Sequence, residues 1–118
     1  MDERGWMQIY QMLEKGADIH PQLLQQAETH KGAMGQTFFH WVCLEGSLEA
    51  IQRLIVAGVN IDSQNALGNT ALMEVAAAGR EDVFYLLKGA GADMTIRNHD
   101  DEDIHEYLEL YGIELPDD

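Results

Sequence analysis

The sequence has 118 residues and a formal net charge of −14, with 21 acidic and 7 basic residues. A chain of this length is expected to form one domain, and its acidity disfavours nucleic acids and anionic membranes as partners, because both need a basic surface. No run of 18 apolar residues and no basic region followed by an apolar stretch is present, so neither a transmembrane helix nor a secretion signal is predicted.

The N-terminal part is predicted to cap the domain in two steps. Residues 1–19 contain a capping helix over 3–15, which ends in the run Met12-Leu13-Glu14-Lys15-Gly16-Ala17-Asp18. Residues 20–32 are interpreted as an insertion with a short helix over 21–29, because proline suits a first helical turn and Gly32 can end the helix. This insertion either contacts a partner or covers the exposed N-terminal face.

The middle of the chain repeats itself with a period of 33 residues. Gly35-Gln36-Thr37 returns as Gly68-Asn69-Thr70, and the later matches are Gly46 with Gly79, Leu54 with Leu87, and Gly58 with Gly91. A self-match at this period predicts stacked units, each of which buries its apolar face only against its neighbours.

Each unit, 33–65 and 66–98, is predicted to form a turn and two helices. In the second unit Thr70 caps a helix over 71–78, which Gly79 ends in the left-handed conformation. A second helix follows over 81–89, and its predicted buried stripe is Val83, Leu86 and Leu87. Thr37 and Gly46 are expected to act likewise in the first unit, with helices over 38–44 and 48–57.

These units resemble the ankyrin repeat, a β-turn and two antiparallel helices with the signature T-P-L-H-x-A. The matching runs are Thr37-Phe38-Phe39-His40-Trp41-Val42 and Thr70-Ala71-Leu72-Met73-Glu74-Val75; neither has the proline, and Met73 replaces the histidine. The resemblance implies an all-α helical solenoid with two full repeats and incomplete capping repeats at both ends. It also implies that His40 braces the turns by hydrogen bonding.

Residues 99–118 are predicted to form an acidic C-terminal cap. Gly112 lies 33 residues after Gly79, so a helix over 103–111 is expected to begin an incomplete repeat. Strict register places His105 and Glu109 at buried positions, so we expect a local shift or a frayed end. Residues 98–118 hold nine acidic and no basic residues, which indicates either a solubilising cap or a surface that steers a basic partner.

No motif indicates catalysis, a metal site or a cofactor. The five histidines lack metal-ligand spacing, and residues 98–103 lack the glycine and distal glutamate of a calcium loop. Cys43 lies near His40 without an orienting third group; as the only cysteine it is expected in the core, and it suits a reducing, cytoplasmic location. We expect a protein that is not an enzyme.

In a stack of this family the turn tips and one face of each first helix line a concave groove. The resemblance places twelve candidate partner-binding residues there: Met34, Gln36, Trp41, Leu44, Glu45, Leu67, Asn69, Glu74, Asp100, Glu102, Tyr107 and Tyr111. Aromatic residues and methionine are enriched at interface centres. The alternative interpretation is that Trp41 and the two tyrosines pack in the core.

Two functions fit these features. The first is a small acidic inhibitor or immunity-type protein, monomeric when free, that neutralises a basic enzyme or toxin. The second is an adaptor or regulatory scaffold that docks other proteins without inhibiting them. Fold resemblance alone does not choose between them.

Overall fold

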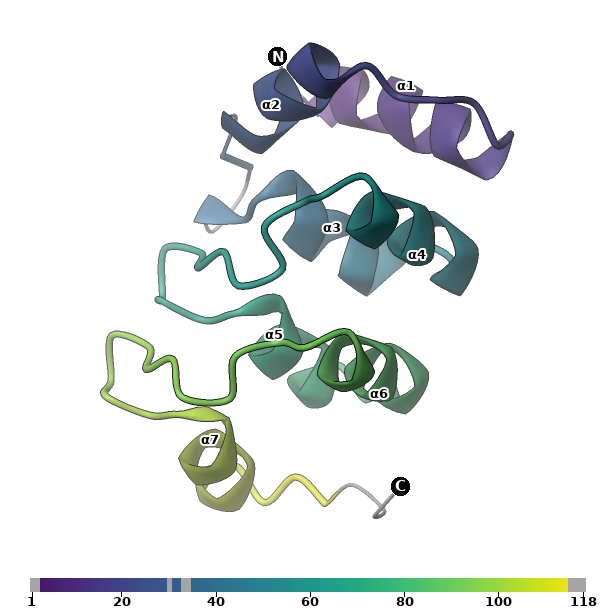
Figure 1. Ribbon diagram of the computed structural model, residues 1–118. Helices are drawn as coiled ribbons and strands as arrows, with labels where there is room; N and C mark the ends of the chain where they lie inside the picture. The colour runs from purple at the N-terminus through teal and green to yellow at the C-terminus, as the bar shows by residue number, and fades with distance from the viewer. Residues whose placement is uncertain (1–2, 30, 33–34, 115–118) are drawn as a thin grey trace.

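The computed structural model describes residues 3–29, 31–32 and 35–114, and in this part of the chain helices are joined by turns (Figure 1). The helices are α1 (Glu3–Glu14), α2 (Pro21–Thr29), α3 (Phe38–Glu45), α4 (Leu48–Val56), α5 (Ala71–Ala77), α6 (Glu81–Gly89) and α7 (Ile104–Leu110). Figure 1 shows them in layers, with α1 and α2 at one end and α7 at the other. The predicted all-α solenoid is confirmed, and each predicted helix agrees within one residue at either end.

Short polar side chains fix where the helices begin. The side chains of Thr37, Ser47, Thr70 and Asp103 each accept a hydrogen bond from the backbone N–H three residues later. Each cap satisfies a donor that the first turn of a helix leaves without a partner. The predicted caps Thr37 and Thr70 are thereby confirmed.

Gly46 departs from the repeat. Gly79 has the predicted left-handed conformation, with φ of 77°, and the next N–H returns to the carbonyl of Val75. Gly46 instead is extended, with φ of −96° and ψ of 175°, so the expectation that it ends α3 in the same way is wrong. The reason is a competing partner, because the N–H of Ser47 donates to the hydroxyl of Tyr10, 3.0 Å away.

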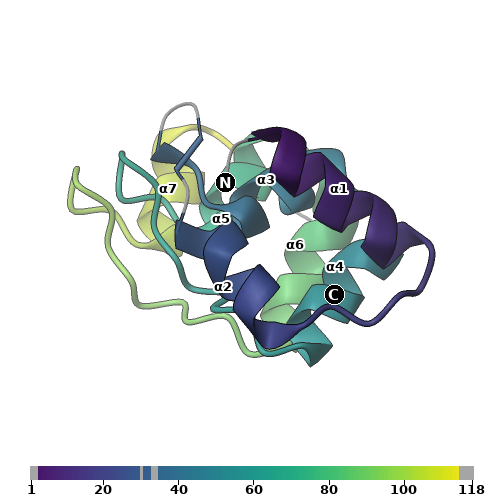
Figure 2. The same ribbon diagram turned by 90° about the horizontal axis from the view of Figure 1, so that it is seen from above.

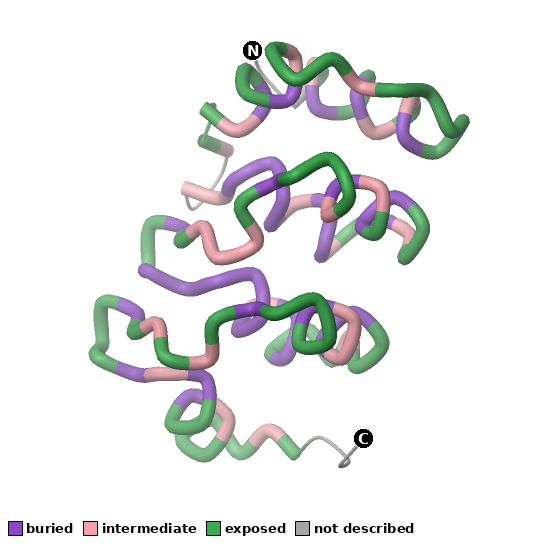
Figure 3. Tube along the Cα trace, viewed as in Figure 1, coloured by how far each residue is buried: buried purple, intermediate pink, exposed green. Residues whose placement is uncertain are grey.

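One apolar core runs through all the layers, as Figure 3 shows. Its largest fully buried side chains include Trp6, Phe38, Phe39, Leu54, Leu72, Leu87 and Ile104. The predicted stripe of α6 needs one correction. Val83 and Leu87 are buried, but Leu86 is half-buried and Phe84 is buried in its place. Leu86 turns instead toward the surface of the outer helices, where it lies with Ile55 and Tyr85.

The two N-terminal helices cover the next layer together, and α1 also contacts α3, where Trp6 lies on Phe38 and Tyr10 on Trp41. Helix α1 packs against α4 and α2 against α3, and Figure 2 shows α1 and α2 nearest the viewer, above that layer. Leu24 and Ala27 of α2 are buried, and the indole N–H of Trp6 donates to the carbonyl of Ala27 at 2.9 Å. The insertion therefore folds as part of the N-terminal cap.

Helix α7 keeps the register of the repeat, so the expected shift or frayed end is wrong. Asp103 caps α7 as Thr70 caps α5, and Gly112 is left-handed, with φ of 65°. His105 and Glu109 are nevertheless exposed, although their counterparts in α5, Leu72 and Ala76, are buried. No described helix packs on the far side of α7, which explains the difference.

Candidate protein-binding surface

A histidine joins the first turn to the second. The Nε2 of His40 lies 2.9 Å from the carbonyl oxygen of Asn69, and its Nδ1 lies 2.7 Å from the hydroxyl of Thr37. The imidazole is fully buried, and this burial lowers the pKa of His40. Bracing of the turns by this residue is confirmed.

Two asparagines, 33 residues apart, build the next two turns in the same way. The Oδ1 of Asn65 accepts the N–H groups of residues 67 and 69, and the Oδ1 of Asn98 accepts those of residues 100 and 102, all at 3.0 Å. The Nδ2 of Asn98 then donates to the Oδ1 of Asn69 and to the Oε1 of Glu102, at 2.9 and 2.8 Å. Adjacent turns are thus joined through side-chain amides.

The conformation at the tip of each turn is also repeated. Gly35, Gly68 and Asp101 occupy equivalent positions, with φ of 67°, 77° and 62°. A Cβ on Gly68 would lie 2.6 Å from the backbone nitrogen of His99, and a Cβ on Gly35 would lie 2.8 Å from that of Ala66. The first two positions need glycine for space as well as for φ, whereas Asp101 carries a Cβ.

Three of the twelve candidates are buried, which corrects the expectation that they face the groove. Asn69, Glu102 and Tyr107 are only 5%, 6% and 8% exposed. The Asn69 side chain is held by Glu74 and by Asn98 of the next turn, and the Glu102 side chain is held by Asn98 of its own turn. Tyr107 packs in the core, and its ring lies 4.7 Å from that of Tyr111.

The other described candidates reach solvent to different extents. Leu67 and Tyr111 are 49% and 56% exposed, and Glu45 and Asp100 are also exposed. Gln36, Trp41, Leu44 and Glu74 are half-buried. Glu74 accepts hydrogen bonds from the amides of Asn65 and Asn69, and Met34 lies outside the described residues. The described candidates thus include separate exposed apolar residues and exposed carboxylates.

Trp41 lies at the edge of an aromatic cluster, so the core interpretation holds in part. Its ring centroid lies 6.0 Å from that of Trp6, 6.1 Å from that of Phe38 and 5.8 Å from that of Tyr10. Together with Met7, Tyr10, Glu45 and Gly46 it lines a pocket of ≈ 380 Å³. Trp41 therefore contributes both to packing and to an accessible surface.

Charge at the C-terminal end is partly compensated. The guanidinium of Arg97 lies 3.0 Å from the carboxylate of Glu106 and 3.7 Å from that of Asp101. The cap hydrogen bond from the N–H of Glu106 lowers the pKa of Asp103. The side chains of Glu102, Glu106, Glu109 and Leu110 surround a shallow pocket on α7. Acidic side chains therefore gather at this end of the stack.

Sequence reasoning missed an apolar groove on the outer helices. It is lined by Gln52, Ile55, Val56, Tyr85, Leu86, Gly89 and Ala90 of α4 and α6, with a volume of ≈ 500 Å³. Val56 is 87% exposed. The signal is the apolar pair Ile55-Val56, which continues past the buried Leu54.

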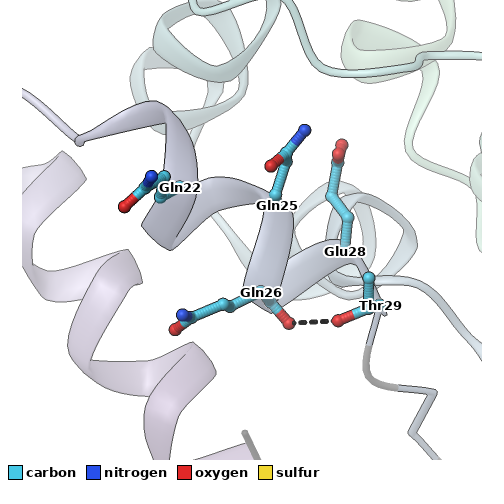
Figure 4. A pocket seen from close by; sticks show the side chains of 5 residues that line it. All are labelled: Gln22, Gln25, Gln26, Glu28 and Thr29. Atoms are coloured by element: carbon cyan, nitrogen blue, oxygen red, sulfur yellow. Dashed lines mark hydrogen bonds between the residues drawn. The ribbon is translucent and has the colours of Figure 1, made fainter.

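A second missed pocket lies on the inserted helix α2 and is lined only by polar side chains (Figure 4). Figure 4 shows Gln25 and Glu28 pointing to the same side, while the hydroxyl of Thr29 donates to the carbonyl of Gln26 at 2.9 Å. Burial raises the pKa of the Glu28 carboxyl, opposed by a hydrogen bond from the backbone of Asn60. The Oε1 of Glu28 is buried without a hydrogen-bond partner among the described residues.

Within the described ranges, no group of three or more histidine, cysteine or acidic residues is arranged to hold a metal ion. Cys43 is fully buried, and burial raises the pKa of its thiol well above the ordinary range. A buried thiol of this kind is a poor nucleophile. No helix among the residues described has the length and apolarity needed to cross a membrane.

Comparison with known proteins agrees with this geometry. Residues 9–98 match the family description "Ankyrin repeats (3 copies)". Among solved structures, that of EF0377, an ankyrin repeat protein, superposes with a TM-score of 0.65 at 23% sequence identity. The match covers 88% of this chain and 51% of that one, so this chain spans about half its length. A search of curated proteins found no match. Ankyrin repeats are typically non-catalytic protein–protein interaction modules, and this chain belongs to the ankyrin repeat family.

Proposed function

We propose that this protein is a stoichiometric inhibitor that binds a basic protein through its concave face. The observation that carries the proposal is the placement of exposed apolar side chains beside carboxylates on that face. Leu67 and Tyr111 are about half exposed, and Asp100 lies on the turn next to Leu67. Apolar anchors ringed by charge are the usual composition of a specific interface.

The charge distribution supports a basic partner. The net charge is −14, and the acidic residues gather at the C-terminal end, where α7 and its preceding turn carry them. A surface of one sign attracts an oppositely charged protein and raises the association rate, by roughly 10–1,000-fold at low salt. Neutralising an enzyme or toxin favours rapid association, because an active molecule must be covered before it acts.

The direct test is affinity capture from the source cell lysate, with elution by a salt gradient. A basic protein that is retained in a one-to-one ratio and released as salt rises supports the proposal. The activity of that protein is then measured with and without this chain. Retained activity in the saturated complex would exclude inhibition.

Matched surface variants show which face is used. Tyr111→Ala changes the concave side, and Val56→Ser changes an even more exposed residue of the outer helices. The proposal expects Tyr111→Ala to lose the basic partner and Val56→Ser to keep it. The reverse result would move the binding site to the outer helices.

The apolar groove on α4 and α6 favours a second candidate, an adaptor. It is carried by the outer helices, whereas the first surface is carried by the turns and inner helices. Two separate surfaces suit a protein that joins two partners. If two proteins are captured together, and Val56→Ser releases only one of them, the adaptor function is favoured over the inhibitor.

A further inference from the structure

Helices α1 and α3 line a pocket at the junction between the N-terminal cap and the first repeat. Its lining residues are Met7 and Tyr10 from α1, and Trp41, Glu45 and Gly46 from α3 and its end, around a volume of ≈ 380 Å³. We propose that this pocket binds one cationic side chain, arginine or lysine, of the basic partner. The inference rests on the proposed function, since it names an anchor on that partner.

The aromatic walls are held rigidly. The rings of Tyr10 and Trp41 lie 5.8 Å apart at an interplanar angle of 80°, so they form two sides of a corner. The Tyr10 hydroxyl accepts a hydrogen bond from the N–H of Ser47 at 3.0 Å and donates to the carboxylate of Glu14. Trp41 is packed on Trp6 and Phe38. Little side-chain freedom is left to lose when a ligand binds.

The shape of the pocket depends on Gly46. A Cβ at this position would lie 2.8 Å from Cε1 of Tyr10 and 2.7 Å from the carbonyl oxygen of Val42. The extended conformation of Gly46, which breaks the pattern set by Gly79, sends the N–H of Ser47 to the Tyr10 hydroxyl. The extended conformation of Gly46 and the position of the Tyr10 ring are therefore linked through the N–H of Ser47.

The chemistry of the lining selects a cation. Tryptophan and tyrosine rings attract a guanidinium or ammonium group through their negative faces. Glu45 is exposed and contributes a carboxylate at the rim, and Met7, 44% exposed, adds a polarisable apolar contact for an aliphatic stem. An anion would meet the carboxylate of Glu45, and a purely apolar group would leave it without a partner.

The pocket can be tested without the natural partner. The probes are three blocked tripeptides, Gly-Arg-Gly, Gly-Lys-Gly and Gly-Gln-Gly, added to ¹⁵N-labelled protein while the two indole N–H signals are followed by NMR. The chain has two tryptophans, and the indole of Trp6 is buried and bonded to Ala27, so its signal is an internal control. We expect the Trp41 signal to move with arginine or lysine, at millimolar peptide, and not with glutamine.

A matched pair of variants isolates the carboxylate. Glu45→Gln is expected to weaken binding of the cationic tripeptide by about two- to fivefold, as for loss of one exposed charge pair. Glu109→Gln makes the same change of charge on α7 and should leave the Trp41 titration unchanged. Equal response to all three peptides, equal loss in both variants, or an unmoved Trp41 signal would overturn the inference.

The two proposals fail in different ways. If a captured basic protein binds wild type and Glu45→Gln equally, the pocket proposal falls and the inhibitor proposal stands. If the Trp41 signal responds selectively to the cationic tripeptides but no basic protein is captured, the pocket stands and the proposed partner falls. Arginine and lysine are distinguished by which tripeptide saturates at the lower concentration.

Discussion

The Nε2 of His40 donates its proton to the carbonyl oxygen of Asn69, 29 residues later in the chain, over 2.9 Å. The direction follows from chemistry, because a carbonyl oxygen only accepts. The other ring nitrogen must then accept from the Thr37 hydroxyl, which lies 2.7 Å away. Both ring nitrogens are satisfied by the neutral imidazole, and a second proton would reverse the Thr37 hydrogen bond and place a charge in the core.

The free energy of unfolding should therefore fall as the pH is lowered and His40 has to bind a second proton. Burial lowers the pKa of His40 in the folded state, so below the unfolded value of about 6.5 the unfolded chain binds more protons. The free energy of unfolding is expected to drop by up to about 1.4 kcal/mol per pH unit between that value and the folded pKa. Denaturant midpoints at about pH 7.5 and 5.5 measure the drop.

The repeat supplies the comparison variant, His40→Met, since Met73 occupies the equivalent position. Because it has no titrating ring, this variant should lose less stability over the same pH interval than wild type, although it is less stable at neutral pH. An identical pH dependence in both proteins would assign the effect to other groups.

Gly68 and Gly79 have the same φ, 77°, but different surroundings. A Cβ on Gly68 would lie 2.6 Å from the backbone of His99, whereas a Cβ on Gly79 would meet nothing within 4 Å. Gly79→Ala should cost about 1–2 kcal/mol, the left-handed strain alone. Gly68→Ala should cost clearly more, because two turns must separate. Equal losses by chemical denaturation would contradict the contact between the turns.

Arg80 reaches back to the preceding repeat. Its Nη1 donates to the carbonyl oxygens of Cys43 and Gly46, at 2.7 and 2.9 Å, at the end of α3. Arg80→Ala should destabilise by about 1–3 kcal/mol, because charged donors to such carbonyls are worth that much. Arg97→Ala removes exposed ion pairs with Asp101 and Glu106 and a hydrogen bond to the Asp101 carbonyl at the surface, and it should cost less than Arg80→Ala. Thermal unfolding measures both losses, and the midpoint of Arg80→Ala should lie below that of Arg97→Ala.

Cys43 should resist alkylation while the protein is folded. The side chain is fully buried, and burial raises the pKa of the thiol, so neither access nor thiolate is available. Mass spectrometry after treatment with iodoacetamide should find the native protein unmodified and the denatured protein modified once. Rapid labelling without denaturant would show that α3 opens locally.

Tyr111 is the better test of a binding anchor than Trp41. Tyr111 is 56% exposed, whereas Trp41 packs against three other rings, so Trp41→Ala also lowers stability. If Tyr111 is a hot spot, Tyr111→Ala weakens binding of the partner by at least about 2 kcal/mol. Calorimetric titration measures the loss, and an unchanged thermal midpoint shows that the fold is intact.

The 33-residue period and its local signals predicted the helix bounds well, because the capping threonines Thr37 and Thr70 and the glycines Gly79 and Gly112 act within a single helix end. The groove was predicted less well. The resemblance assigns Asn69 and Glu102 to a face by position, but both side chains turn inward to hydrogen-bond with Asn98. The Asn69 partner lies in the next turn and the Glu102 partner in its own turn, and neither contact is visible in the repeat pattern.

The pocket between α1 and α3 shows the same limit. Gly46 matches Gly79 in sequence, but it is extended, with the next N–H donated to the hydroxyl of Tyr10, from a helix outside the period, and its carbonyl hydrogen-bonded to Arg80. Repetition predicts what the units share. It gives no signal for a contact that is made once, at the junction with a cap.

Asp101 has a consequence for attempts to lengthen this array. Gly35 and Gly68 leave room for the backbone of the turn that follows each of them, and Asp101 holds the same conformation while filling that room with a Cβ. In a consensus repeat fused beyond α7, the backbone of the added turn would clash with the Cβ of Asp101 before it reached the close contact made at Gly35 and Gly68. An engineered extension should therefore begin with Asp101→Gly and with apolar residues at His105 and Glu109.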